Sequence, residues 1–268
     1  MTKGATASER YLGSLARKAF LSLWSHPNVY TDENKKAGKG VGTELCDLLV
    51  VFGNDVLIYS DKHIEFKVTG NLTVDWKRWY RRAIEKSARQ LRGAKTWLQR
   101  FPNRLFLDPQ CSVPFPVPLP KSGEANFHLT AVTRGSYDVC ESYFGGKSLG
   151  SLRIHTGLIG SEEPFSVGLI DGPKSIIHVL DEFTVDLLLR ELDTVFDFTA
   201  YLRAKERFLT GRDIVISVPG EEQLLAIYLT KLNSKGEHDI VLPQLEKAKD
   251  LPDFIALDES FWAPLPTE

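Results

Sequence analysis

The sequence predicts an α/β fold, because segments typical of strands alternate with segments typical of helices. Two short runs rich in Leu, Val and Ile, residues 45–52 and 56–60, are separated by a glycine-containing turn and are expected to form a hairpin. A long segment, 75–100, repeats apolar residues at helical spacing. Further strand and helix patterns follow in the second half. With 268 residues, 43% of them hydrophobic, the chain is long enough to bury a substantial core.

The N-terminal segment predicts a helix over residues 9–24, which Pro27 ends because proline disfavours helix in the residue before it. A short strand over 28–31 and a loop over 32–42 that contains three lysines follow. The loop is expected to lie beside the hairpin and to be available to a substrate. The apolar face of the helix is expected to contain Leu12, Leu15, Ala19, Phe20 and Leu23.

The hairpin brings polar residues together in one of two registers. If Gly53 and Asn54 form a two-residue loop, Asp47 lies opposite Ser60, and Lys62 projects from the same face of the sheet. If the loop has three residues, Asp47 faces Asp61 and Lys62 projects from the opposite face. The sequence alone does not choose between these registers.

The helix over 75–100 is strongly basic. Seven apolar residues, beginning with Trp76, predict a buried stripe, which leaves the cations on the exposed flanks where they can meet phosphates. Only Asp75 and Glu85 carry negative charge, and a solvated surface helix usually carries mixed charge. The expected stripe consists of Trp76, Tyr80, Ala83, Ile84, Ala88, Leu91 and Leu98, and the cations are Lys77, Arg78, Arg81, Arg82, Lys86, Arg89, Arg92, Lys95 and Arg100.

Charge is unevenly distributed along the chain, although the net charge is only −2. Residues 1–100 contain 18 Lys and Arg against 10 Asp and Glu, a balance of +8, whereas the remaining residues contain 15 against 25, a balance of −10. The basic half is the one that suits a phosphate-rich partner. The acidic half is a candidate surface for a protein partner or for a second copy of the chain.

The rest of the chain predicts further strands and helices around irregular segments. The prolines between residues 109 and 121 alternate with Phe115 and Val117, which predicts an extended strap packed across the domain. The segment Gly145-Gly146-Lys147-Ser148 lacks the earlier glycine of a phosphate-binding loop, and residues 136–172 are expected to be irregular. The expected strands are 104–107, 126–134, 165–170, 175–180 and 214–218, and the expected helices are 183–209 and 224–232.

Several common functional classes have no support in the sequence. The three cysteines are widely spaced, and the six histidines, which include His63, His128, His155 and His178, show no ligand spacing, so we expect them to be structural. No apolar run is long enough for a membrane span, and the N-terminus lacks the apolar region of a signal peptide. A soluble cytoplasmic protein is therefore expected.

Asp47 on one strand, followed after a hairpin by an acidic-x-Lys pattern on the next, resembles the PD-(D/E)XK nuclease superfamily over roughly residues 9–110. The spacing Glu44-x-x-Asp47 is similar to its NERD-like and restriction-endonuclease-like branches. The resemblance implies a restriction-endonuclease-like core, with a mixed central sheet flanked by helices, over residues 1–135. An appended α/β region over 136–268 would select the substrate or partner.

The resemblance also implies a chemistry. Asp47 matches the first acid, which with a second carboxylate holds a divalent ion, Mg²⁺ or Mn²⁺, and Lys62 matches the lysine that positions the attacking water. Ser60 stands where the family has its second acid, so Asp61 supplies that carboxylate through a bulge, Glu44 supplies it, or the site is degenerate. A second pattern, Glu65-Phe66-Lys67, lies beyond the strand that faces Asp47 and is the weaker match.

The expected function is hydrolysis of DNA phosphodiester bonds by a metal-dependent endonuclease, by resemblance in a restriction, repair or antiviral defence system. The alternatives are a catalytically degenerate nuclease fold that serves as a DNA-binding or scaffolding subunit, and a protein-interaction module. The expected catalytic residues are Glu44, Asp47, Asp61 and Lys62, of which the three acids are the expected metal ligands. The expected nucleic-acid contacts are Lys77, Arg78, Arg81, Arg82, Lys86, Arg89 and Gln90.

Overall fold

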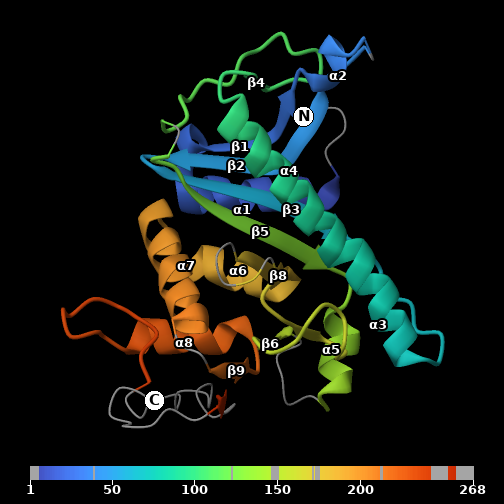
Figure 1. Cartoon of the computed structure of the whole chain (residues 1–268), viewed down its shortest axis with the longest axis vertical. Coiled ribbons are helices and arrows are strands. Elements are labelled where there is room, and N and C mark those ends of the chain that lie inside the picture. Colours follow the sequence, from blue (N-terminus) through green and yellow to red (C-terminus); the bar gives the residue numbers. More distant parts are fainter. Residues whose placement is uncertain are drawn as a thin grey trace.

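The protein is an α/β molecule built on a mixed six-stranded sheet, as a computed structural model shows (Figure 1). The strand order is β4-β1-β2-β3-β5-β8. The pairs from β4 to β3 are antiparallel, and β3, β5 and β8 run parallel to one another. The structure describes residues 6–38, 40–121, 123–145, 151–170, 172, 176–211, 214–242 and 253–257.

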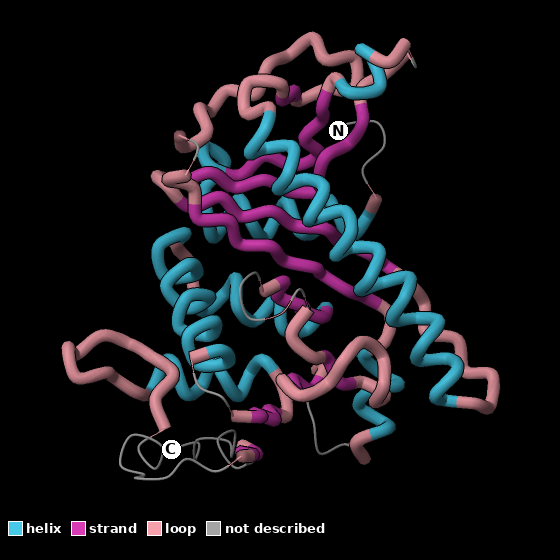
Figure 2. The backbone as a smooth tube through the Cα atoms, viewed as in Figure 1, coloured by secondary structure: helices cyan, strands magenta, loops and turns pink. Residues whose placement is uncertain are grey.

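Helices cover both faces of this sheet (Figure 2). On one face, side chains such as Leu49 and Ile58 pack against Ala88 and Leu91 of the long helix that crosses the sheet diagonally. On the other face, Leu48 and its neighbours pack against the first helix and against helices from the second half of the chain. This arrangement confirms the predicted fold class, a mixed central sheet flanked by helices, and it is consistent with a restriction-endonuclease-like core.

The first half follows the predicted order closely. Leu12, Leu15, Ala19 and Phe20 are buried as expected, but Leu21 leaves the helical conformation with a φ of 61° and Leu23 is exposed, which corrects its expected place in the core. The elements are α1 (Ala7–Trp24), β1 (Ser25–Thr31), α2 (Glu33–Lys36), β2 (Thr43–Phe52), β3 (Asp55–His63), α3 (Leu72–Tyr80), the π-helical turn η1 (Arg81–Glu85), α4 (Lys86–Arg100), β4 (Leu105–Phe106) and β5 (Asn126–Arg134).

The second half departs further from the predictions. The single helix expected over 183–209 is two helices, because the chain leaves the helical conformation at Leu192 and Thr194 caps a new helix by accepting from the amide of Asp197. The segment 136–172, expected to be irregular, contains a helix and two short strands. The elements are α5 (Tyr137–Tyr143), β6 (Arg153–His155), β7 (Ser166–Val167), β8 (Ile177–Asp181), α6 (Glu182–Glu191), α7 (Val195–Thr210), β9 (Val215–Val218), α8 (Glu221–Thr230) and β10 (Phe254–Ala256).

Some predicted features lie partly or wholly outside the described residues. These are Lys39 of the loop over 32–42, and Gly146, Lys147 and Ser148 of the glycine-rich segment. The proline-rich strap is described except at Ser122 beyond its end, and it is confirmed, since Phe115, Val117 and Leu119 pack against the core on the α4 side of the sheet.

The two halves share one sheet and one core. The expected boundary between residues 135 and 136 falls at the end of β5, yet β8 from the second half pairs with β5 as the edge strand of the same sheet. Phe20 of α1 also meets Phe198 of α7 edge to face, with ring centroids 5.3 Å apart. A smaller sheet, in the order β10-β9-β6-β7, extends the second half. The C-terminal half therefore continues the N-terminal core.

Gly135 ties the end of β3 to the end of β5. Its carbonyl accepts from the amide of Phe66, and its φ of +92° is one that residues with a side chain rarely adopt. A Cβ at this position would lie 2.6 Å from the carbonyl oxygen of Ile64. Both the backbone conformation and the close approach therefore require glycine.

We expect Gly135→Ala to destabilise the fold more than Gly123→Ala, by about 1–3 kcal/mol in urea denaturation. Gly123 is the matched control, because its φ of +88° carries the same conformational strain while nothing lies within 4 Å of its added Cβ. Equal losses in the two variants would show that the approach of Ile64 does not matter.

Candidate active site

The hairpin adopts the register of a two-residue loop. Phe52 pairs with Asp55 and Leu48 with Tyr59, so Gly53 and Asn54 form the turn, and Gly53 has a φ of +56° that suits glycine. The same register, continued, places Asp47 opposite Ser60. Since side chains alternate along a strand, Ser60 and Lys62 share the face that α4 covers, whereas Asp61 shares the opposite face with Tyr59.

Asp47 lies at the point where the β2–β3 ladder ends. Its Oδ2 accepts from the backbone N–H of Asp61 at 2.5 Å and lies 3.5 Å from Nζ of Lys62. The Asp47 side chain is 3% exposed and the Lys62 side chain 21%. Burial raises the pKa of Asp47, while Lys62 and the amide of Asp61 act in the opposite direction. The structure therefore brings the expected first acid and the expected lysine together on one face.

Ser60 occupies the position where the resemblance expects an acid, and its side chain is tied to α4. Its hydroxyl contacts the hydroxyl of Ser87 at 3.3 Å and Oε1 of Gln90 at 3.1 Å. Ser87 in turn donates to the carbonyl of Ala83 at 2.7 Å. Gln90, expected among the nucleic-acid contacts, is thus held beside the strand that carries Lys62.

A β-bulge lies beside Glu44. Val29 pairs with Cys46 and the next residue, Tyr30, pairs with Glu44, so Leu45 is an extra residue on β2. An extra residue shifts the alternation of side chains, which changes the direction in which Glu44 projects relative to Asp47. Oε1 of Glu44 accepts from Nδ2 of Asn28 at 2.8 Å, and burial, followed by the charges of Asp47 and Glu9, raises the pKa of Glu44.

Asp61 is engaged on the other face of the sheet. Nε of Arg134 lies 3.1 and 3.3 Å from its two carboxylate oxygens, and the guanidinium stacks over the ring of Tyr11. Burial raises the pKa of Asp61 to about 6, although Arg134 opposes the rise. In this structure the Asp61 carboxylate is the partner of Arg134, and only its backbone N–H contacts Asp47.

Two residues near these acids were missed by the sequence reasoning. Glu9 of α1 accepts from Nδ2 of Asn28 at 3.4 Å, and its charge acts on Glu44, Asp47 and Asp61. Glu9 also caps α1 by accepting from the amide of Thr6, a pattern that its spacing from Thr6 could have revealed. Asn28, with a φ of +51°, offered no such signal.

The carboxylates suit a hard divalent cation in chemical type, because Mg²⁺ prefers oxygen ligands and the clustered charges of Glu9, Glu44 and Asp47 oppose one another. Within the described residues, however, the oxygens of Glu44, Asp47 and Asp61 do not all lie within 4.8 Å of one another. The second acidic-x-Lys, Glu65-Phe66-Lys67, follows the end of β3. Its Lys67 is exposed.

The predicted basic helix is confirmed as a nearly continuous rod, α3-η1-α4, with every residue of the expected apolar stripe buried. Its expected cations are exposed, except Lys95, which is half-buried. A hollow of about 540 Å³ lies between α4 and the start of β2. It is lined by residues that include Glu44, Arg89, Gln90 and Arg100, so this hollow is a groove with basic side chains beside Glu44.

No protein-family model, curated protein or solved structure matches the chain. Among the described residues, no helix combines the length and apolar character needed to cross a membrane.

We expect Arg134→Met to destabilise the protein by about 3 kcal/mol at about pH 8 and by clearly less at about pH 4.5. Because the pKa of Asp61 is higher in the folded than in the unfolded chain, the folded state binds more protons between about pH 4 and 6, so stability falls as pH rises through that window. Removing the Arg134 guanidinium raises the pKa of Asp61 further, so the stability of the variant falls more steeply than that of the wild type as pH rises.

Urea denaturation at the two pH values measures the effect. The double variant Asp61→Asn/Arg134→Met is the control, since it lacks the Asp61 carboxylate, so its loss of stability relative to the wild type should not grow between about pH 4.5 and about pH 8. A pH-independent loss in Arg134→Met would contradict the role given to this ion pair.

Proposed function

We propose that the chain is a divalent-metal-dependent nuclease of the PD-(D/E)XK type that hydrolyses phosphodiester bonds of DNA. The observation that carries the proposal is the pairing of Asp47 with Lys62 on the face of the sheet beneath a basic helix. In this proposal Asp47 supplies a carboxylate for the metal ion, Lys62 supplies an ammonium group, and the basic helix above them supplies side chains that bind phosphates. The proposed setting is a cytoplasmic restriction or antiviral defence system.

In the proposed mechanism Glu44 and Asp47 hold the cation, and Lys62 donates a hydrogen bond to the attacking water or to a phosphoryl oxygen. A bound Mg²⁺ or Mn²⁺ neutralises charge on the phosphate and favours deprotonation of water. Lys62 is suited to its role because Asp47 fixes its position while about a fifth of its side chain remains open to solvent.

Two observations support Glu44 over Asp61 as the second metal ligand. The Asp61 carboxylate is already bonded to Arg134 on the opposite face. Asp61 would need a bulge in the β2–β3 pairing to reach the site, but that pairing is regular through all its pairs. The bulge lies instead in the β1–β2 pairing, between Glu44 and Asp47. Glu44 also lines the groove below α4, where a substrate would approach.

The basic helix is the proposed binding surface for the DNA backbone. Arg89 and Arg100 line the groove, and Lys77, Arg78, Arg81, Arg82 and Lys86 extend the positive surface along α3, η1 and the start of α4. Contacts of this kind recognise phosphates without reading the base sequence. A π-helical turn inside a helix is frequent at functional sites, and η1 lies in the middle of this surface.

The alternative is a catalytically degenerate nuclease fold that binds DNA as a subunit of a complex. The observation that favours it is Ser60, a residue with no charge that is buried and bonded to Gln90 at the position of the second acid. In that case a protein partner or a second copy of the chain is proposed to use the acidic second half.

We expect the wild-type chain to cleave plasmid DNA when Mg²⁺ or Mn²⁺ is titrated in, and Lys62→Ala and Asp47→Asn to lower the cleavage rate by on the order of 100-fold or more. The physical reason is the loss of a donor or of a cation ligand at the reacting phosphate. Initial rates on supercoiled plasmid measure the effect, and circular dichroism checks that each variant is folded.

Lys67→Ala is the matched control, because this exposed lysine belongs to the second acidic-x-Lys pattern and should leave the rate unchanged. DNA binding without cleavage at any Mg²⁺ or Mn²⁺ concentration would select the degenerate alternative. Cleavage that survives in folded Lys62→Ala would remove Lys62 from the mechanism.

Salt dependence tests the DNA surface separately from the chemistry. We expect Arg89→Ala to reduce the slope of log K against log salt concentration by about 1, because one phosphate contact and its released counterions are lost. Lys235→Ala, an exposed lysine of the second half, should not change the slope. Fluorescence anisotropy with a labelled duplex across a salt series provides the measurement, and equal slopes for wild type and Arg89→Ala would contradict the proposed surface.

A further inference from the structure

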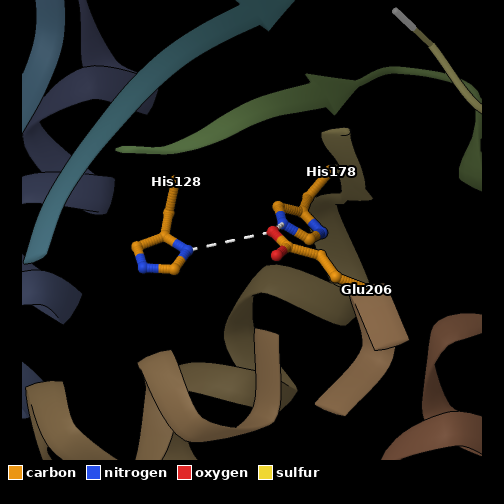
Figure 3. Close-up of side chains that lie close together, drawn as sticks. All are labelled: His128, His178 and Glu206. Atoms are coloured by element: carbon orange, nitrogen blue, oxygen red, sulfur yellow. Dashed lines mark hydrogen bonds and ion pairs between the residues drawn. The ribbon is translucent and has the colours of Figure 1, made fainter. Parts of the chain in front are cut away.

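A second polar cluster lies far along the chain from the candidate nuclease site. It joins His128 on β5, His178 on β8 and Glu206 on α7, and one ligand atom from each residue lies within 4.8 Å of the others (Figure 3). His128 and His178 are buried, and their side chains point toward the Glu206 carboxylate. The sequence predicted a structural role for both histidines, because the histidines show no spacing typical of metal ligands.

The distances suit a small metal ion. Nε2 of His178 lies 3.0 Å and Nδ1 of His128 lies 3.9 Å from Oε1 of Glu206. In a tetrahedral site with metal–ligand bonds of about 2.0–2.1 Å, neighbouring ligand atoms lie roughly 3.3 Å apart. The observed separations bracket this value, so small side-chain shifts would bring all three atoms to one ion.

The protonation pattern of His128 leaves a ligand atom facing Glu206. Nε2 of His128 lies 3.1 Å from Oδ1 of Asp55, and Arg203 holds the same carboxylate oxygen at 3.0 Å. If Nε2–H donates to Asp55, the neutral ring presents a lone pair at Nδ1, which has no hydrogen-bond partner within the described structure. A lone pair aimed at a carboxylate is unfavourable unless a proton or a metal cation lies between them.

A metal-binding histidine commonly donates its other ring N–H to a carboxylate, which fixes the ring orientation and makes the ligand nitrogen more basic. Asp55 occupies that position here. Glu206 is also placed to act as a ligand, because its carboxylate oxygen contacts Nε2 of His178 and faces Nδ1 of His128.

We propose that His128, His178 and Glu206 bind one zinc ion, which fastens α7 to strands β5 and β8. Two imidazoles and one carboxylate form a ligand set that Zn²⁺ favours, whereas Mg²⁺ prefers oxygen ligands alone. Both histidines are buried, which assigns the ion to stability and not to turnover of a substrate.

The test uses the full-length chain, free of any affinity tag, after treatment with a chelator. We expect the wild type to take up about one equivalent of Zn²⁺ with a Kd below about 1 µM, and Co²⁺ to give the visible absorption of a four-coordinate ion. Glu206→Gln, which keeps the shape and one acceptor for His178, should weaken Zn²⁺ binding by more than about 100-fold, and Asp55→Asn by about 10–100-fold.

Two control variants test whether Zn²⁺ binds at this cluster or elsewhere on the protein. His63→Gln removes an exposed histidine, and Asp47→Asn changes the proposed nuclease site; both should retain the full equivalent of Zn²⁺. Folded wild-type protein that takes up no stoichiometric Zn²⁺ would overturn the proposal, whether or not the variants fold. The same result follows if folded Glu206→Gln binds Zn²⁺ as tightly as the wild type, and neither outcome bears on DNA cleavage.

Discussion

The register of the β2–β3 hairpin is the constraint on which the candidate site depends. Side chains alternate with a period of two, so a slip of one residue would move Lys62 to the face that Asp61 now occupies. It would also exchange apolar side chains between the two layers and disrupt the packing on both faces of the sheet. The turn at Gly53 and Asn54 sets the register, and the apolar side chains on both faces enforce it. The contact between Asp47 and Lys62 therefore follows from core packing elsewhere along the strands.

Three buried carboxylates are each held by an opposite charge. Asp61 has Arg134, Asp47 has Lys62 and a backbone amide, and Glu221 of α8 has Lys205 and the hydroxyl of Tyr201. Such pairs add little net stability compared with apolar packing, but removing one partner leaves an uncompensated charge. The groups that would contact a substrate or a cation are thus fixed in place before either one binds.

Local patterns predicted the parts of the fold that local physics controls. The hairpin, strand β5 and the apolar stripe of the basic helix follow from periodicity and turn chemistry, and the structure agrees with them. The helix break at Thr194 was missed because the segments on both sides of it contain several Leu and Phe residues. The extra residue Leu45 was missed because a bulge is defined by the pairing with β1, which sequence periodicity does not report.

Sequence patterns report local contacts better than contacts between distant segments, and the two candidate sites differ in this respect. Asp47 and Lys62 could be predicted because one hairpin joins them, whereas His128, His178 and Glu206 meet only through the parallel pairing of β5 with β8 and the packing of α7. Strand β3 nevertheless connects them, since Asp55 at its start supports His128 and Lys62 near its end pairs with Asp47. A cation held by the histidine cluster would therefore also stabilise the hairpin turn, because the Asp55 that pairs with Phe52 there contacts His128. An ion at the histidine cluster would thus fix the start of the strand whose far end carries Lys62.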